Sequence, residues 1–496
     1  MVSAESAAAP PTDARMLDFR PVLYALGPLL GVLAGFMLVP AAADYLAGNE
    51  DWQVFLTSAA VTVFTGVALI LGFRDADARI NLRQGFLLTG AAWIVVAAFA
   101  ALPLRFASIG LNYPSAYFEA MSGLTTTGST AIADLSVMPP GMLLWRGLLN
   151  GLGGAGIIVM ALVMLPFLSI GGMQLFRMES SDRSDKIFPR INQIAGAVVG
   201  VYVLLIGLCA FCFWLAGMPA FDAVVHAMAA LATGGFGNLN DSFASYPPQI
   251  LWIGTLFMAV GGMPLALFVL VLRRGPQLLL RDPQVRAFLL TLVSLWLVMT
   301  VWLWQQGEAS FPVALTQAAF NVTAILTTTG FASADWLRWG GFAAACFAFL
   351  FIVGGCTGST SGGIKIFRFQ ILILLLRRHR IESVFPHAVE VRRYAGRTIG
   401  DDVIRSVLVL FALYGATVAL IAMGLGAVGL DLLTALGCAL TAVGNIGPGL
   451  TPETGPAGNF AHLPDSAKWL MALGMLMGRL EFSAVFVMLS RRFWQP

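Results

Sequence analysis

Four short segments of this 496-residue chain combine Thr, Ser, Asn and Gly within otherwise apolar sequence. Glycine lets the backbone turn its carbonyl oxygens toward a common axis, because no Cβ obstructs that conformation. No residue of the four segments is acidic or basic, so a ring of carbonyls would suit a weakly hydrated monovalent cation better than a divalent cation or an anion. The candidate ion-binding residues are Thr126, Thr127, Gly128 and Ser129; Thr233, Gly234, Gly235 and Phe236; Thr328, Thr329, Gly330 and Phe331; and Asn445, Ile446, Gly447 and Pro448.

The segments recur at similar spacing, since Gly128, Gly235, Gly330 and Gly447 are separated by 107, 95 and 117 residues. Each segment follows an apolar stretch of about 10–14 residues, which is too short to cross a bilayer and predicts a re-entrant helix. The negative C-terminal end of such a helix would favour a cation at the centre. A single T-T-T-G stretch is as well explained by a helix C-cap. Four copies, each after a half-length helix, favour a shared pore lining.

A second candidate is the glycine-rich stretch 354–363, which interrupts a long apolar run. It lacks the spacing of a phosphate-binding loop and has no preceding strand pattern. Irregular backbone at membrane depth must lie against protein or water, so we predict a flexible constriction below the filter. A glycine kink for close helix packing is the alternative. The candidate gate residues are Gly354, Gly355, Thr357, Gly358, Ser359, Thr360, Ser361, Gly362, Gly363 and Arg479.

Arg479 is in this set because it lies inside the last apolar run, where a charge marks a functional site or a paired structural one. It is predicted to repel cations or to hold the glycine-rich stretch, with a local salt bridge to Glu481 as the alternative. Four further polar residues stand beside the short helices or the spans that follow them. They either support the filter or merely cap and pair, and they are Glu119, Arg146, Asp222 and Asn321.

The elements that must position these residues are membrane spans. The chain is 58% hydrophobic and 11% charged, with a mean hydropathy of +0.82, whereas soluble domains carry roughly 25% charged residues. Runs long enough for a helix of about 20 residues begin near Val22, Trp52, Gln84, Met142, Ala195, Ile250, Val285, Gly340, Val403 and Lys468. The expected fold is an all-α polytopic membrane protein with four pseudo-symmetric repeats of span, pore helix, filter and span around a central pore. Two extra transmembrane helices in residues 1–75 precede repeats over 76–190, 191–283, 284–382 and 383–496.

Charge placement predicts the orientation. Arg and Lys cluster between alternate spans on one side, which the positive-inside rule makes cytoplasmic. We therefore expect a multi-pass protein of the cytoplasmic (inner) membrane with both termini in the cytoplasm. The basic loops could contact anionic lipid, and their grouping does not indicate nucleic acid. The start of the chain has no apolar run typical of a cleaved signal peptide. The four histidines are scattered, so neither a metal site nor an enzyme is indicated, and no cofactor is expected.

At these residues the sequence resembles the Trk/Ktr/HKT superfamily of K⁺ transporters. The resemblance covers nearly the whole chain and is carried by 122–130, 145–159, 171–177, 320–333, 354–368, 444–450 and 467–481. It implies a homodimer, a cytosolic RCK-type nucleotide-binding partner, a gate at 354–363 and an Arg479 side chain beneath the filter. Glycine at each filter position implies preference for K⁺ over Na⁺. The fourth segment departs most from the pattern and leaves Gly444 and Gly447 as alternatives for its filter glycine.

The function expected from these features is K⁺ uptake through a selective, channel-like pore, with K⁺ as the substrate. A proton- or sodium-coupled K⁺ symporter is the alternative from another class, although the four segments offer no titratable group for coupling. A purely structural membrane subunit is the third possibility. Flux through the isolated protein separates the three.

Overall fold

The computed structural model describes residues 18–75, 80–164, 191–307, 309–385, 393–480 and 483–495. The motif at 171–177, the basic cluster from Arg177 to Arg190 and the side chain of Glu481 lie outside these residues. The described chain is helical apart from two pairs of two-residue strands, as an all-α membrane protein requires. The predicted fold class is confirmed.

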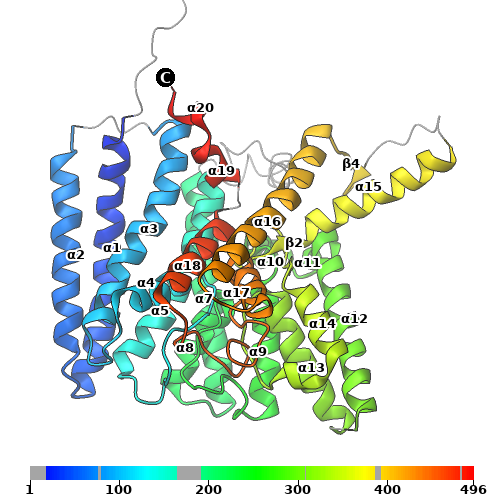
Figure 1. Cartoon of the computed structure of the whole chain (residues 1–496), viewed down its shortest axis with the longest axis horizontal. Coiled ribbons are helices and arrows are strands. Elements are labelled where there is room, and N and C mark those ends of the chain that lie inside the picture. Colours follow the sequence, from blue (N-terminus) through cyan, green and yellow to red (C-terminus); the bar gives the residue numbers. More distant parts are fainter. Residues whose placement is uncertain are drawn as a thin grey trace, which may run out of the picture.

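The chain starts with a helical hairpin, α1 (Arg20–Leu46) and α2 (Trp52–Gly72), which stands at one side of the molecule in Figure 1. The two helices pack closely because glycines meet: a Cβ on Gly27 would lie 2.7 Å from the carbonyl oxygen of Gly66. At the turn, the Asp51 carboxylate accepts hydrogen bonds from the backbone N–H and hydroxyl of Ser108 at 3.1 and 2.7 Å. These contacts attach the hairpin to the first repeat.

Four repeats follow, each with a long helix, a short helix, an irregular segment and a further helix. The first contains α3 (Leu82–Phe106), α4 (Tyr113–Leu124) and α5 (Pro140–Met164), and the second α7 (Ile191–Leu215), α8 (Ala220–Leu231), α9 (Pro248–Gly261) and α10 (Leu265–Arg274). After α11 (Gln277–Arg281), the third contains α12 (Pro283–Gln305), α13 (Phe311–Leu326), η1 (Trp336–Trp339), α14 (Gly341–Leu350), β1 (Val353–Gly354), β2 (Ile364–Lys365) and α15 (Ile366–Val384). After β3 (Arg393–Tyr394) and β4 (Arg397–Thr398), the fourth contains α16 (Asp401–Ala427), α17 (Leu432–Gly444) and α18 (Asp465–Arg479), followed by α19 (Ser483–Leu489) and α20 (Arg491–Trp494).

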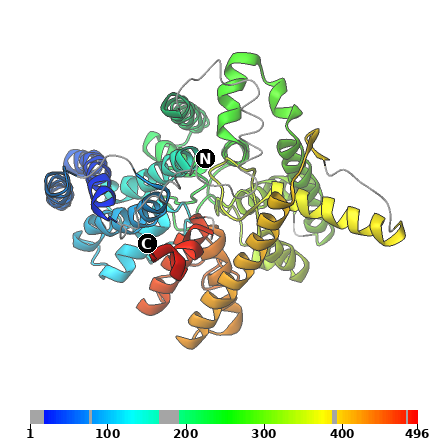
Figure 2. The ribbon, with the colours of Figure 1, turned by 90° about the horizontal axis from the view of Figure 1, so that it is seen from above.

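The repeats surround a common centre, as the order of colours in Figure 2 shows. Seven described helices are long and apolar enough to cross a membrane, or eight when α9 and α10 count as one span bent by 98°. The other two predicted spans differ from expectation. The run near Gly340 is divided into α14 and α15 by the glycine-rich stretch, and the run near Lys468 is the 15-residue α18, which ends at Arg479.

The short helices are largely buried, and two of them, α4 and α17, begin at side-chain caps. The side chain of Asn112 accepts the N–H of Ser115 at 3.0 Å before α4, and that of Asp431 accepts the N–H of Thr434 at 3.1 Å before α17. Both ends of the described chain lie together at one face, where the Phe19 and Trp494 rings stack with centroids 6.4 Å apart. Across this joint the Arg83 guanidinium donates to the carbonyl oxygen of Gln495 at 2.6 Å.

Candidate ion pathway

The four predicted segments share one backbone conformation, which begins as a helix C-cap. The residue two before the glycine has a left-handed φ in every segment: 50° at Thr126, 50° at Thr233, 56° at Thr328 and 52° at Asn445. The residue after it closes the short helix in the same way, for example through Thr127 N–H to Ser122 O at 2.8 Å and Thr329 N–H to Ala324 O at 2.7 Å. The C-cap and the pore lining are therefore not exclusive alternatives, since the cap turns the chain into each segment.

A left-handed φ is rare for β-branched residues and stores backbone strain of about 1–3 kcal/mol. Threonine takes this conformation in three of the four segments, so tertiary contacts must hold it there. Glycine follows two residues later, again with positive φ: 85° at Gly128, 72° at Gly235, 81° at Gly330 and 114° at Gly447.

The four glycines close a ring. A Cβ built on Gly128 would lie 2.5 Å from the carbonyl oxygen of Gly234, one on Gly235 would lie 1.9 Å from that of Thr329, and one on Gly330 would lie 2.0 Å from that of Ile446. A Cβ on Gly447 would lie 3.1 Å from the carbonyl oxygen of Thr127, which returns the sequence of contacts to the first repeat. Each glycine thus makes room for the carbonyl that precedes the glycine of the next repeat.

This geometry distinguishes Gly447 from Gly444. Gly444 is the last residue of α17, whereas Gly447 has the positive φ and the neighbour that match the other three glycines. Its approach to the next carbonyl is the longest of the four, and the Ser129 hydroxyl donates to the Gly447 carbonyl oxygen at 2.7 Å. The fourth segment therefore has a carbonyl engaged by a side chain of the first.

Residues 354–363 fold into a loop whose two ends pair as the parallel strands β1 and β2. Glycine is needed at the crossing, because a Cβ on Gly354 would lie 2.0 Å from the carbonyl oxygen of Gly362, and Gly363 has a φ of 63°. Inside the loop the Ser359 and Ser361 hydroxyls are 2.8 Å apart, and the Ser361 hydroxyl accepts the Gly355 N–H at 3.0 Å. These bonds give the loop an internal framework.

The loop is held by the break between α9 and α10. Pro264 ends the α9 pattern, since proline disfavours helical conformation in the residue before it, and leaves the carbonyls of Gly261 and Gly262 free. They accept the N–H groups of Thr360 at 3.3 Å and Cys356 at 2.8 Å. Two further bonds complete the attachment: Leu265 N–H to Gly358 O at 3.1 Å and Thr357 N–H to the Gln284 side chain at 3.0 Å.

The same loop touches the left-handed residues of the second and third segments and the end of the fourth short helix. The Thr233 hydroxyl lies 3.2 Å from the Thr360 hydroxyl, and the Thr328 hydroxyl accepts the Gly362 N–H at 2.6 Å. Gly363 N–H donates to the Gly444 carbonyl at 2.9 Å. Within the described residues, the loop therefore lies directly against three of the four repeats.

Arg479 supplies the contact to the first repeat. Its side chain is 5% exposed, and Nη2 donates both to the hydroxyl of Thr126 and, at 2.8 Å, to the carbonyl oxygen of Thr360. One guanidinium thus joins the first of the four segments to the loop. Whether Glu481 pairs with it lies outside the described residues.

The four polar residues left undecided by the sequence lie beside the outer ends of the segments. Glu119 accepts the Ala131 N–H at 2.7 Å and the Arg146 Nε–H at 2.8 Å. Asn321 accepts the Ser333 N–H at 3.2 Å. Asp222 accepts an N–H of the Asn238 side chain at 2.6 Å.

Comparison with known proteins matches this chain along nearly its whole length. The family model of the TrkH cation transport proteins matches residues 51–495. The chain belongs to the TrkH family. It is 45% identical over 479 residues to the Trk system potassium uptake protein TrkI of Halomonas elongata, covering 96% of this chain and 97% of that protein. It is 33% identical to TrkH of Vibrio parahaemolyticus over 97% of this chain and 100% of that one.

The structure of this chain also matches a solved structure of a TrkH protein. The crystal structure of the potassium transporter TrkH from Vibrio parahaemolyticus superposes with a TM-score of 0.89 at 32% sequence identity, covering 97% of this chain and 100% of that one. The superfamily resemblance stated from the motifs is thus confirmed.

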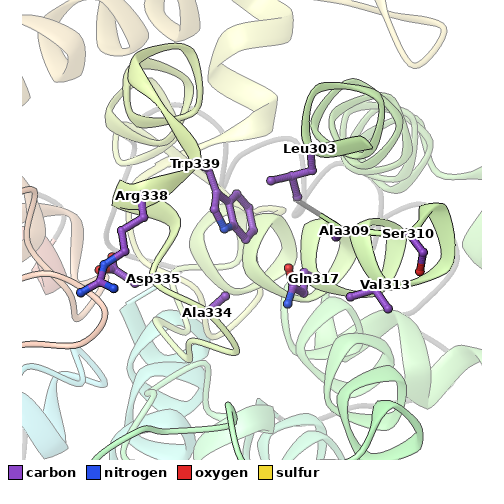
Figure 3. Close-up of a pocket in the computed structure, with 9 residues that line it drawn as sticks. All are labelled: Leu303, Ala309, Ser310, Val313, Gln317, Ala334, Asp335, Arg338 and Trp339. Atoms are coloured by element: carbon purple, nitrogen blue, oxygen red, sulfur yellow. The ribbon is translucent and has the colours of Figure 1, made fainter. Parts of the chain in front are cut away.

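A hollow of about 570 Å³ in this TrkH-family chain lies behind the third short helix, away from the ring. Figure 3 shows Trp339 between Leu303 and Gln317 on one side and the Asp335 and Arg338 pair on the other. None of the four filter segments lines it.

Two residues near the filter were missed from the sequence. His226 was treated as one of four scattered histidines, yet it is fully buried beside Gly237, and Asn150 lies against Gly234. A signal was present for His226: it stands nine residues before its filter glycine, as do Glu119 and Asn321. For Asn150 the signal was its spacing of one helical turn from Arg146.

Proposed function

We propose that this TrkH-family protein takes up K⁺ across the cytoplasmic membrane through a channel-like pore. The observation that carries the proposal is the closed ring of four glycines, each packed on a carbonyl of the next repeat. Carbonyl oxygens arranged around an axis replace the hydration shell of K⁺ in channel filters. The relatives at 45% and 33% identity are both named as potassium uptake proteins, which supports K⁺ as the substrate.

The K⁺-binding residues proposed are the sixteen of the four segments, with Gly447 as the fourth filter glycine. The segments contain no charge, so the field at the ring comes from carbonyl dipoles and from the C-terminal ends of α4, α8, α13 and α17. Such a field favours a monovalent cation that loses its water readily over a divalent one.

The loop 354–363 and Arg479 are proposed as the gate. The proposal is supported by the bonds of the loop and Arg479 to Thr126, Thr233, Thr328 and Gly444. With these bonds made, backbone and a positive charge would obstruct an ion that leaves the segments. Opening would require the loop to leave these partners. These hydrogen bonds are few, so binding of a regulatory partner could shift the equilibrium between the closed and the open pathway.

The face that carries both ends of the described chain is proposed to be cytoplasmic. In support, α15 and α20, which carry Arg380 and Arg491, lie on the upper side of the molecule in Figure 1, where the chain ends, as expected of the inner side. A homodimer and a cytosolic RCK-type nucleotide-binding subunit are proposed as partners from the superfamily resemblance. Anionic lipid is proposed to contact the same basic loops.

The test is flux of radioactive Rb⁺ into liposomes that contain only this protein. We expect uptake driven by an inside-negative potential, with weak competition by Na⁺ and no dependence on a pH gradient. Dependence on a proton or Na⁺ gradient would support the symporter instead, and absence of flux would support a structural subunit. Growth at low K⁺ of a strain lacking K⁺ uptake gives a second readout, in which Gly330→Asp should fail to rescue.

A further inference from the structure

Three of the four short helices direct a side chain at the backbone that leaves the filter segment, and the fourth carries a cysteine at the same position. The four residues stand nine positions before the filter glycine: Glu119, His226, Asn321 and Cys438. Glu119 accepts Ala131 N–H at 2.7 Å and the Thr130 hydroxyl at 3.0 Å, while Asn321 pairs with the backbone and hydroxyl of Ser333. His226 lies against Gly237, where a Cβ would be 3.3 Å from Nε2, and Cys438 is fully buried.

Glu119 is the charged member of this set, and its counter-ion comes from the helix that follows the same segment. The Nε of Arg146 is 2.8 Å from Oε1 of Glu119, with the two side chains 2% and 0% exposed. A buried pair of this kind holds its geometry, because removing one partner leaves an uncompensated charge in a medium of low dielectric.

Arg146 also reaches the second repeat. Its Nη1 donates to the carbonyl oxygen of Gly237 at 2.8 Å, and its guanidinium carbon lies 4.2 Å from the centroid of the Phe236 ring. Phe236 is itself a filter residue, and Gly237 is the residue after it. The planar guanidinium therefore binds the outer end of the first segment through Glu119 and that of the second directly.

The position of Arg146 on α5 is set by small residues. A Cβ on Gly147 would lie 2.9 Å from the Val225 side chain, and one on Gly154 would lie 3.1 Å from Ala232, so α5 approaches α8 closely. Asn150, one turn beyond Arg146, lies against the filter residue Gly234. This face of α5 thus presents a cation and an amide to the second segment.

At the equivalent described position, the second and fourth repeats carry no cation. Gly153, Gly261 and Gly478 are equivalent, since a Cβ on each would press on the last carbonyls of the preceding short helix, at 2.0, 2.9 and 2.1 Å. Seven residues earlier stand Arg146, Gly254 and Met471. Arg146 therefore has no charged counterpart at this position in the second and fourth repeats, and its ionic contact joins the first segment to the second.

We propose that Arg146, with Glu119, is a positioning residue that sets the relative placement of the first and second filter segments and thereby the selectivity of the pore. This inference rests on the proposed K⁺ pathway and extends it to one of the four junctions. Removal of the bridge would let the Phe236 and Ala131 backbones move apart, so the ring would accept a smaller ion with its water.

The test compares the Rb⁺ to Na⁺ flux ratio of purified variants in liposomes, together with their melting temperatures. Arg146→Lys keeps the charge but cannot hold Glu119, Gly237 and the Phe236 ring at once, and we expect it to lower the ratio by about tenfold, equivalent to about 1.4 kcal/mol of discrimination. Arg146→Gln should lower it further. Arg338→Gln is the matched control and should leave the ratio unchanged. The Arg338 side chain is exposed, its Nε lies 3.1 Å from Oδ2 of Asp335, and neither residue belongs to a filter segment.

A merely structural bridge would lower the melting temperature and leave the flux ratio unchanged, and that result in Arg146→Lys would overturn the proposal. If Arg146→Gln does not fold, Arg146→Lys and Glu119→Asp decide the question by the same criterion. A wild-type protein without any Rb⁺ flux would instead overturn the proposed function. The two failures are thus distinguishable.

Discussion

Nη2 of Arg479 donates a hydrogen bond to the carbonyl oxygen of Thr360 at 2.8 Å, so the last helix of the fourth repeat is bonded to the loop of the third. The same nitrogen bonds the hydroxyl of Thr126 in the first filter segment. The loop itself bonds the second and third segments. One loop and one guanidinium thus contact all four repeats beneath the ring.

Replacing Arg479 by Ala should raise Rb⁺ flux in the absence of any regulatory partner. The change removes both donors to Thr126 and Thr360 and the positive charge that opposes cations. The measurement is Rb⁺ uptake into liposomes at fixed membrane potential. Shortening the loop 354–363 should act in the same direction, and unchanged flux and partner control in both variants would contradict the gate.

Thr328→Val should also raise unregulated flux. It removes the hydroxyl that accepts Gly362 N–H at 2.6 Å, and a buried N–H left without a partner costs about 1–3 kcal/mol. The loop would therefore be held less firmly against the third segment. Thr316→Val in α13, the short helix before this segment, is the control, since its exposed hydroxyl bonds the local Pro312 carbonyl at 2.9 Å. Equal flux in the two variants would argue against a role for the Thr328 contact.

Gly330→Ala should abolish selective Rb⁺ flux. The new Cβ would lie 2.0 Å from the Ile446 carbonyl oxygen, and the φ of 81° disfavours any L-residue. The carbonyl of the fourth segment must then leave the ring. Gly415→Ala, in an open helical position of α16, is the control and should stabilise the protein by about 1 kcal/mol without changing flux.

Asp51→Asn should lower the melting temperature and leave the Rb⁺ to Na⁺ ratio unchanged. The carboxylate is 6% exposed and accepts two hydrogen bonds from Ser108, and loss of such bonds costs about 1–3 kcal/mol. The effect should stay in stability, because the hairpin joins the first repeat away from the ring. Glu50→Gln, at an exposed neighbour, should change neither quantity; a shift in ion selectivity with Asp51→Asn would show that the hairpin influences the filter.

Much of the fold followed from hydropathy, since apolar length and charge placement respond to the bilayer rather than to particular partners. The exceptions are instructive. The spans expected near Ile250 and Gly340 are bent or divided, because Pro264 and the glycine-rich loop interrupt them and their free backbone groups bond to one another.

The sequence by itself determined where glycine lets one backbone approach another closely, because this depends on the absence of a Cβ and is a property of the residue. It thereby predicted four segments around one axis. The left-handed φ of Thr126, Thr233 and Thr328 depends instead on tertiary contacts. The tertiary structure decided which carbonyl each glycine receives, that Gly447 rather than Gly444 occupies the fourth position, and that Arg146 bridges the first and second segments. The physical reason is that hydrogen bonds and buried ion pairs form between groups that folding brings together, here from repeats about a hundred residues apart, and a local pattern carries no record of its distant partner.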